Sequence, residues 1–270
     1  MLAASEWPPA GIDGSGGVMK IDRNYVLVVL VGFAVLAINA ESYLRLDRDF
    51  APAPGIEQSP LYRKKIAVIG DSYVQNHVGS IADTWHYRLA QKYQMHYLNY
   101  GRTGNRMVIP RPANGVEILK RYTEIPADVD YLVVVAGHND AYAIMRLNGQ
   151  DIVTETTPEI AAKRETMLAQ FKSGCRELCA KLKECYPRAK IAFVTPWAVD
   201  RPFFPQIIET IKAETAAAGI PCFDASSAGI NPNDAAVRKR YFQSEKDDAH
   251  LNPAGHGVML EAIEGFFKTL

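Results

Sequence analysis

Short apolar runs rich in β-branched residues alternate along most of this chain with longer segments of mixed polarity. The runs show no clean alternation of apolar and polar residues, which is typical of strands buried on both faces of a sheet. The longer segments predict helices, several of them opened by a proline or closed near a glycine. The pattern predicts strands at 65–69, 96–99, 131–136, 190–195 and 221–224, and helices at 81–93, 115–122, 158–185, 205–218 and 253–268.

Strands that alternate with helices predict a parallel sheet covered by helices on both faces, joined by right-handed crossovers. The alternation starts near Lys64 and continues to the C-terminus. We therefore expect residues 64–270 to form one α/β domain with three layers, α/β/α, around a five-stranded and mostly parallel sheet.

A different apolar run lies near the N-terminus, at residues 25–40. Lys20 and Arg23 precede it, which is the order of a basic region and a hydrophobic region in an export signal. The run is shorter than the ~20 residues that comfortably span a bilayer, and it ends in Ile38-Asn39-Ala40, a possible cleavage site. It predicts either a signal peptide or a signal-anchor helix, and both remain open. Either one places the domain in the periplasm or another extracytoplasmic space.

The segments on both sides of this run have a different composition. Residues 1–24 begin with many Gly, Pro, Ser and Ala residues and show no apolar period, so we expect them to be disordered. Residues 41–63 carry mixed charge followed by Ala-Pro-Ala-Pro, and we expect a linker there.

Composition and charge narrow the class of protein. The chain has 270 residues, of which 48% are apolar and 22% charged, as in ordinary globular proteins. Lys+Arg and Asp+Glu balance at 30 each, whereas nucleic-acid-binding domains usually carry a basic excess. No P-loop, dinucleotide fingerprint or internal repeat is present. We expect no nucleic-acid partner and no cofactor, and the oligomeric state stays open.

The four cysteines do not predict a metal site, because no two form a CxxC pair. Cys175 and Cys179 share the apolar stripe of a predicted helix, one turn apart, and we expect small buried side chains there. That spacing does not favour a disulfide, which needs Cβ atoms ~3.8 Å apart. A bridge between Cys185 and Cys222 remains open.

Polar side chains that can do chemistry gather where the predicted strands end. In open α/β sheets, ligands bind beside the carboxyl ends of the strands, so these groups should meet at one edge. They are Gly70-Asp71-Ser72 after the first strand, a loop with Gly101 and Gly104 after the second, Gly137-His138-Asn139-Asp140 after the third, and Asp247 with His250 before the last helix.

These groups are the components of acyl transfer. A serine is a poor nucleophile until a base takes its proton, and an imidazole can do so near neutral pH. A carboxylate holds the imidazole in the useful tautomer. Fixed donors stabilise the oxyanion of the tetrahedral intermediate, each worth about 3 kcal/mol of the barrier.

The order of the four blocks resembles the SGNH (GDSL-type) hydrolase family, from Lys65 to the C-terminus. The resemblance implies a flavodoxin-like α/β fold and a serine esterase without metal or cofactor. It assigns the nucleophile to Ser72, the base to His250 and the orienting acid to Asp247. It assigns the oxyanion hole to the backbone N–H of Ser72, the N–H of Gly104 (less favourably Gly101) and the side chain of Asn139.

Two departures from that family pattern concern substrate binding. His138 stands where many members have glycine, although some esterases of carbohydrate esters are similar to this chain there. Arg102, in the glycine loop, either meets an anionic group of the substrate or is simply solvated. Trp197, after the fourth strand, either lines the pocket or packs. The α/β-hydrolase fold is disfavoured, because residues 70–74 lack the second glycine of its nucleophile elbow.

Other residues near the motifs receive lesser roles. Asp71 is expected to shape the serine turn. Asp248 is spaced less suitably from His250 than Asp247 is, so it is interpreted as a polar neighbour. His256 follows His250 without the pattern of a metal site. We expect residues 141–157 to form a loop or small lid at the site, since long loops are often functional.

The sequence as a whole predicts an exported serine esterase whose substrate is a small-molecule or glycan ester, with a small O-acyl group such as acetyl on a carbohydrate. Three alternatives remain open. They are an O-acyltransferase with the same triad, a lipase or thioesterase, and a non-catalytic glycan-binding domain tethered to the cell envelope. If the apolar run at 25–40 is not cleaved, the membrane is a further partner.

Overall fold

The computed structural model describes residues 55–111, 117–149 and 151–270. The predicted disordered segment, the predicted export signal and most of the predicted linker lie outside these residues. In the described chain, no helix has both the length and the apolar character needed to cross a membrane. Where the predicted linker is described, Ile56 and Leu61 are buried in the core, so the chain already packs onto the domain there.

Five parallel strands form one sheet in the order β2-β1-β3-β4-β5. This is the doubly wound, flavodoxin-like order, which reverses direction between β1 and β3. The predicted α/β fold with a five-stranded parallel sheet is therefore confirmed. The strands are β1 (Lys65–Gly70), β2 (His96–Gly101), β3 (Tyr131–Val135), β4 (Lys190–Val194) and β5 (Cys222–Phe223).

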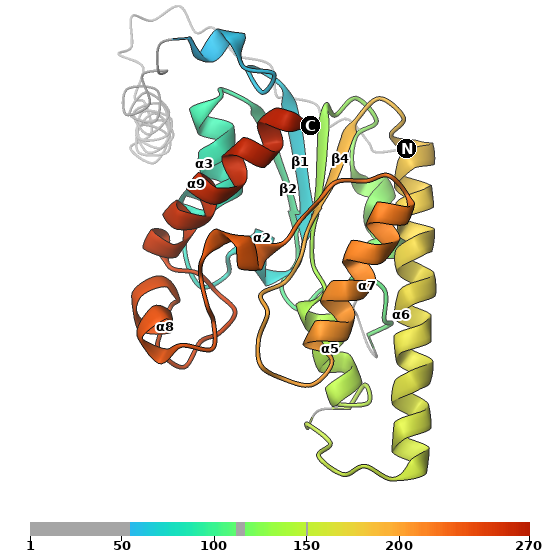
Figure 1. The fold of residues 1–270 in the computed structure, drawn as a ribbon. Coiled ribbons are helices and arrows are strands. Elements are labelled where there is room, and N and C mark those ends of the chain that lie inside the picture. The colour runs from blue at the N-terminus through green and yellow to red at the C-terminus, as the bar shows by residue number, and fades with distance from the viewer. Residues whose placement is uncertain (1–54, 112–116, 150) are drawn as a thin grey trace, which may run out of the picture. The chain divides into compact units, whose positions relative to one another are not determined.

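Helices cover both faces of the sheet, as Figure 1 shows, with α3 and α9 on one side and α5, α6 and α7 on the other. The helices are α2 (Ser72–Gln75), α3 (Trp85–Lys92), α4 (Ile118–Arg121), α5 (His138–Met145), α6 (Pro158–Cys185), α7 (Phe204–Ala217), α8 (Ala235–Tyr241) and α9 (Pro253–Thr269). Short 3-10 turns occur at Ile56–Gln58, Ile81–Asp83, Tyr122–Glu124 and Ala225–Ala228.

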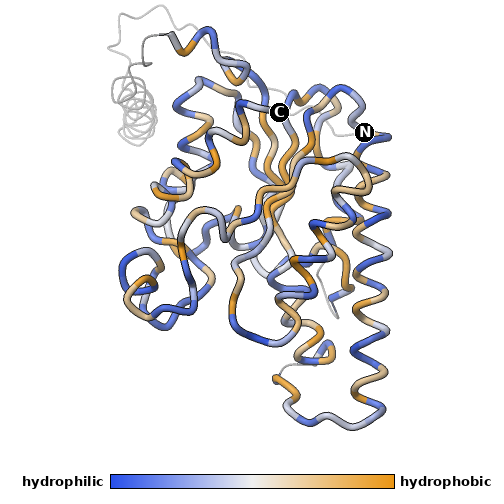
Figure 2. Tube along the Cα trace, in the orientation of Figure 1, coloured by the Kyte–Doolittle hydropathy of each residue, from blue (hydrophilic) through white to orange (hydrophobic). Residues whose placement is uncertain are grey.

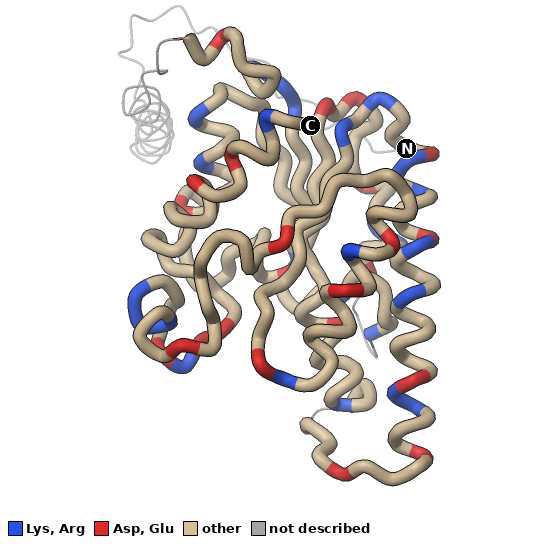
Figure 3. The backbone as a smooth tube through the Cα atoms, in the orientation of Figure 1, with Lys and Arg blue, Asp and Glu red and all other residues tan. Residues whose placement is uncertain are grey.

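Burial explains why the strands lack polar alternation. All five residues of β3 are buried, and so are all but the first residue of β1. The apolar colour in Figure 2 is accordingly concentrated in the strands at the centre. Lys, Arg, Asp and Glu are placed mainly on the helices and loops around them (Figure 3). The sheet is thus a rigid layer whose strand ends can hold side chains in fixed positions.

Helix starts follow the capping signals in the sequence. The side chain of Thr157 accepts a hydrogen bond from Ile160 N–H and is followed by Pro158, so α6 begins where predicted. Asn252 caps α9 in the same way before Pro253.

The sequence missed three helices, α2, α5 and α8, all of eight residues or fewer. The prediction of a loop or lid over residues 141–157 is wrong for Ala141–Met145, which belong to α5. The predicted helix at 81–93 is a 3-10 turn followed by α3. All four cysteines are free thiols, with Cys175 and Cys179 buried.

Candidate active site

The turn from β1 into α2 presents Ser72 at the carboxyl edge of the sheet. The side chain of Asp71 caps α2 by accepting a hydrogen bond from the N–H of Tyr73 at 2.9 Å. This cap fixes Ser72 as the first residue of the helix, with 8% of its surface exposed. The predicted role of Asp71 in shaping this turn agrees with its position.

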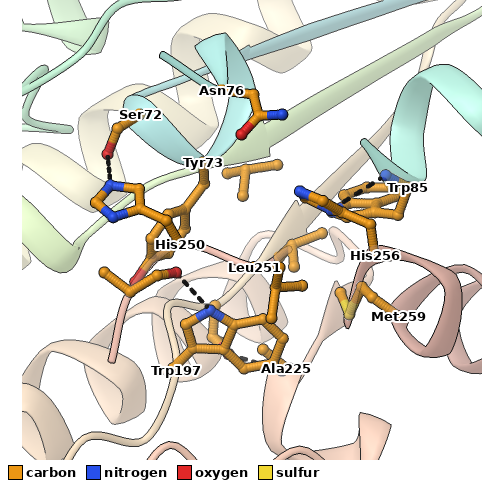
Figure 4. Close-up of a pocket in the computed structure, with 14 residues that line it drawn as sticks. Ser72, Tyr73, Asn76, Trp85, Trp197, Ala225, His250, Leu251, His256 and Met259 are labelled. Atoms are coloured by element: carbon orange, nitrogen blue, oxygen red, sulfur yellow. Dashed lines mark hydrogen bonds between the residues drawn. The ribbon is translucent and has the colours of Figure 1, made fainter. Parts of the chain in front are cut away.

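A chain of hydrogen bonds connects Ser72 with His250 and Asp247, which come from the loop before α9. Ser72 Oγ lies 3.0 Å from His250 Nε2, drawn as a dashed line in Figure 4, and His250 Nδ1 lies 3.1 Å from Asp247 Oδ2. Asp247 Oδ1 accepts the N–H groups of Ala249 and His250 at 2.8 and 3.0 Å. The structure therefore brings together three residues separated by up to 178 positions.

Electrostatics keep Asp247 in its charged form. Burial raises the pKa of Asp247, but hydrogen bonds from the His250 ring and from two backbone N–H groups outweigh burial, so the pKa is lower than its usual value. The ring of His77, in the turn after α2, packs against the His250 ring with centroids 5.1 Å apart. A carboxylate on one nitrogen and a hydroxyl on the other orient the imidazole for proton transfer.

Asn139 lies on the other side of Ser72, at the start of α5. Its Nδ2 donates hydrogen bonds to Asp71 Oδ2 at 3.0 Å and to the carbonyl oxygen of Asn105 at 3.1 Å. These two bonds use both N–H groups of the amide. Burial raises the pKa of Asp71 to about 7. Asp71 thus joins the serine turn to Asn139.

The end of β2, where the glycine loop begins, packs directly on α2. A Cβ at Gly101 would lie 2.3 Å from the backbone nitrogen of Gln75, so only glycine allows this contact. Gly104 has φ +73°, in the left-handed region. Within the described part of the chain, the backbone N–H groups of Ser72 and Gly104 contact no hydrogen-bond acceptor. Both are therefore available to a ligand.

Two charged residues that the sequence did not single out hold this loop. Asp140 is fully buried, and its carboxylate accepts the N–H groups of residues 107–109 at 2.7 to 3.1 Å. Arg121 is 2% exposed and donates to the Asn105 side chain and to the carbonyl oxygen of Tyr100. Asp140 is detectable as part of the Gly-His-Asn-Asp block, whereas nothing in the local sequence marks Arg121 as buried.

The side chains considered for substrate binding occupy different surroundings. His138 is buried, and its Nδ1 lies 2.7 Å from the hydroxyl oxygen of Tyr73. Burial lowers the pKa of His138 to about 3. Trp197 is 5% exposed and donates from Nε1 to the carbonyl oxygen of Ala249 at 3.1 Å, which supports the loop that carries His250. Arg102 is exposed and forms an ion pair with Glu124 at 2.9 Å.

The two remaining candidates also have partners. Asp248 forms an ion pair with Arg201. His256 is buried, and its Nδ1 accepts a hydrogen bond from the N–H of Trp85 at 3.3 Å. Over the residues that the structure describes, no group of three or more His, Cys, Asp and Glu side chains could hold a metal ion.

Two cavities border the hydrogen-bonded residues. The inner cavity has a volume of about 20 Å³, room for roughly one water molecule, and is lined by Ser72, His250 and mainly apolar groups such as Trp197 and Met259 (Figure 4). The outer cavity is open to solvent, has a volume of about 520 Å³, and borders both Asn139 and His250. The outer cavity therefore gives a substrate access to the His250 ring, whose Nε2 is bonded to Ser72.

A doubly wound sheet with a hydrogen-bonded serine, histidine and aspartate at its carboxyl edge is the arrangement of a serine hydrolase. Residues 68–258 match the model of the GDSL-like lipase/acylhydrolase family, and the chain belongs to this family. The resemblance noted from the sequence is thereby confirmed. No curated relative matches the chain.

Solved structures from several bacteria share the fold. A protein from Lactobacillus plantarum is 21% identical over 77% of this chain and 98% of its own, with a TM-score of 0.61. A protein described as a GDSL-like lipase from Bacteroides ovatus is 16% identical over 77% and 99%, with a TM-score of 0.54. An active-site mutant of a family two carbohydrate esterase from Clostridium thermocellum, in complex with cellohexaose, is 14% identical over 77% and 64%, with a TM-score of 0.52.

Proposed function

We propose that this protein is an exported serine esterase that removes a small O-acyl group, such as acetyl, from a carbohydrate, with Ser72 as nucleophile, His250 as base and Asp247 as orienting acid. The observation that carries the proposal is the continuous chain of hydrogen bonds from Ser72 Oγ through the His250 ring to Asp247.

In the acylation step, Ser72 Oγ attacks the ester carbonyl carbon while its proton passes to His250 Nε2. Asp247, held in its charged form, stabilises the imidazolium that results. The tetrahedral intermediate then collapses, the bond to the alcohol oxygen breaks, and the proton on Nε2 moves to that oxygen. The alcohol leaves, and the acyl group stays on Ser72.

In the deacylation step, water takes the place of the alcohol. His250 removes a proton from the water while the water oxygen attacks the acyl carbon. The bond between the acyl carbon and Ser72 Oγ then breaks, and His250 returns the proton to Oγ. The products are the free acid and the original enzyme. A sugar hydroxyl in place of water would make the reaction an acyl transfer.

The oxyanion is stabilised on the side of Ser72 that faces the glycine loop. The N–H groups of Ser72 and Gly104 are the available donors. Asn139 adds a third donor when one of its N–H groups exchanges the carbonyl oxygen of Asn105 for the oxyanion. Each fixed donor contributes on the order of 3 kcal/mol to the transition state.

Two observations support the choice of substrate. The inner cavity beside Ser72 has a volume of about 20 Å³, which suits a methyl group better than a long acyl chain. A carbohydrate esterase that binds cellohexaose is among the proteins with this fold. Support for export comes from the basic residues and apolar run that precede residue 41.

The test uses p-nitrophenyl acetate, butyrate and octanoate with the native chain and with Ser72→Ala. We expect hydrolysis to decrease as the acyl chain lengthens and to fall roughly 10⁴-fold in the variant. Undiminished hydrolysis by a folded Ser72→Ala variant would refute the mechanism. A preference for octanoate would contradict the small acyl group, and faster acyl transfer to an added sugar than to water would indicate an acyltransferase.

A further inference from the structure

The outer cavity is lined by three cationic side chains and two carboxylates. Arg146 reaches it from the end of α5, Arg201 from the loop before α7, and Lys246 from the loop that carries His250. The chain as a whole has as many acidic as basic residues, so this small excess of positive charge is a local property. Three separate segments contribute to it, and all of them meet beside Asn139 and His250.

The acidic residues of the same cavity are already engaged. Asp247 is bonded to His250, and Asp248 forms an ion pair with Arg201. Among the described residues, no carboxylate lies within ion-pair distance of Arg146 or Lys246. With His250 neutral, the three cations and two carboxylates of this cavity give a net charge of +1, and Arg146 and Lys246 are the cations without a carboxylate partner among the described residues.

Two of the guanidinium groups pack against the same aromatic ring. Arg146 Cζ lies 4.9 Å and Arg201 Cζ 5.5 Å from the centroid of the Tyr142 ring. Contact with an aromatic ring stabilises each cation. Arg201 is also ion-paired with Asp248, so an anion that enters the cavity would compensate the charge of Arg146 and accept hydrogen bonds from its guanidinium.

Arg102 provides an instructive contrast, because the sequence made it a candidate for an anionic group. Both oxygens of Glu124 accept hydrogen bonds from its guanidinium at 2.9 and 3.0 Å. It lines neither cavity beside Ser72. Among the described residues that line the outer cavity, the cations with donors free for a substrate are therefore Arg146 and Lys246.

We propose that the ester substrate carries a carboxylate or phosphate on its alcohol portion, and that Arg146 and Lys246 bind this group. This inference rests on the proposed function, in which His250 returns a proton to the departing alcohol. The alcohol must therefore lie next to the His250 ring, and the outer cavity is the one that joins this ring to Arg146 and Lys246. Charge-assisted bonds from a guanidinium to such a group are strong and directional.

The experiment compares three aryl acetates that differ only in the para substituent. They are 4-acetoxybenzoate, 4-acetoxyphenyl phosphate and the neutral methyl 4-acetoxybenzoate. For the full chain and each variant, kcat/KM for an anionic ester is divided by kcat/KM for the neutral one. Comparison of this ratio between variants cancels the intrinsic reactivity of each ester.

We expect Arg146→Ala to lower the ratio by about tenfold or more for the preferred anion, and Lys246→Ala to lower it by a smaller factor. The control is Arg188→Ala, which removes the same charge from an exposed position just before β4 and should leave the ratio unchanged. The native ratio should fall with rising salt concentration because the attraction is screened. The anionic ester whose ratio falls more in Arg146→Ala shows whether the site prefers a carboxylate or a phosphate.

A ratio that is the same in the native chain, Arg146→Ala and Lys246→Ala would overturn the inference, while hydrolysis that depends on Ser72 would still support the proposed function. If the folded native chain cleaves none of the esters, binding of 4-hydroxybenzoate and inorganic phosphate decides the matter. Binding lost in Arg146→Ala would support the anion site without the esterase, and no binding would overturn the site as well.

Discussion

The two sides of Ser72 are built in different ways. On the side of the proposed base (the base side), the side chains of His250 and Asp247 are 21% and 20% exposed and are held mainly by bonds within their own four-residue turn. On the side of the proposed oxyanion hole (the oxyanion side), Asp71 and Asp140 are completely buried and connect three separate segments of the chain. One side is an accessible local turn, and the other is part of the core.

The difference shows which groups can be changed without loss of the fold. A side chain on the base side can be replaced with little effect on packing, so its variants should lose activity alone. When a group on the oxyanion side is replaced, its buried partners lose their hydrogen bonds. Buried polar groups without a partner lower the free energy of unfolding. Its variants should lose stability as well as activity.

The largest effect is expected for His250→Gln, which tests the base side. The glutamine cannot act as a base at neutral pH, so kcat for p-nitrophenyl acetate should fall roughly 10⁴-fold. Because the ring is partly exposed, the free energy of unfolding in urea should change by less than about 1 kcal/mol. A large loss of stability would mean that the two sides are not distinct.

An intermediate effect is expected for Asp140→Asn, which tests the oxyanion side. The amide replaces an acceptor for three backbone N–H groups, and we expect the free energy of unfolding to fall by about 2–4 kcal/mol. The matched control is Asp83→Asn, which removes an ion pair with Arg88 at the surface and should cost less than about 1 kcal/mol. Equal urea midpoints for the two variants would mean that the buried Asp140 contributes no more to stability than a surface ion pair does.

The smallest effect is expected in the pH dependence of stability and concerns His138. Its folded pKa of about 3 lies below the value of 6.5 for an unfolded histidine, so between these pH values only the unfolded chain binds the proton. The free energy of unfolding should therefore fall with decreasing pH, by about 1.4 kcal/mol per pH unit from this residue. His138→Gln should make the slope shallower by that amount, as urea unfolding at pH 5 to 6.5 can measure.

His86 and His256 are also buried with a pKa lowered to about 3 by burial, so the variant should retain a slope in the same direction. Identical slopes for the native chain and His138→Gln would show that His138 binds its proton equally in both states.

Long elements were predictable because their signals are local. α6 begins at Pro158 behind a threonine cap and ends at Cys185, as expected from the sequence. β1, β3 and β4 were predictable because continuous apolar runs fit strands that are buried on both faces of a sheet. In contrast, α2 spans four residues and exists because Asp71 caps it at the edge of the sheet, which no periodicity could reveal.

The sequence predicted the site residues that stand in short motifs, but not those that only the tertiary fold brings to the site. Ser72, Asn139, Asp247 and His250 stand in short motifs, and the topology places these motifs at one edge. Arg121 is the last residue of the short helix α4, and only the tertiary fold buries it against Asn105. The cations of the outer cavity come from three segments that only the tertiary fold brings together, so the sequence did not single out Arg146 or Lys246 and left Arg102 as either a substrate contact or a solvated side chain.

The contact between Gly101 and α2 also limits how this enzyme can diversify. In a library that varies the glycine loop, position 101 should accept no other residue, because any Cβ would meet the backbone of Gln75 at 2.3 Å. A Cβ at position 104 would instead meet the flexible tip of Arg111, and asparagine tolerates left-handed backbone. New substrate preferences should therefore arise from the loops around the outer cavity, while the floor beneath Ser72 stays the same.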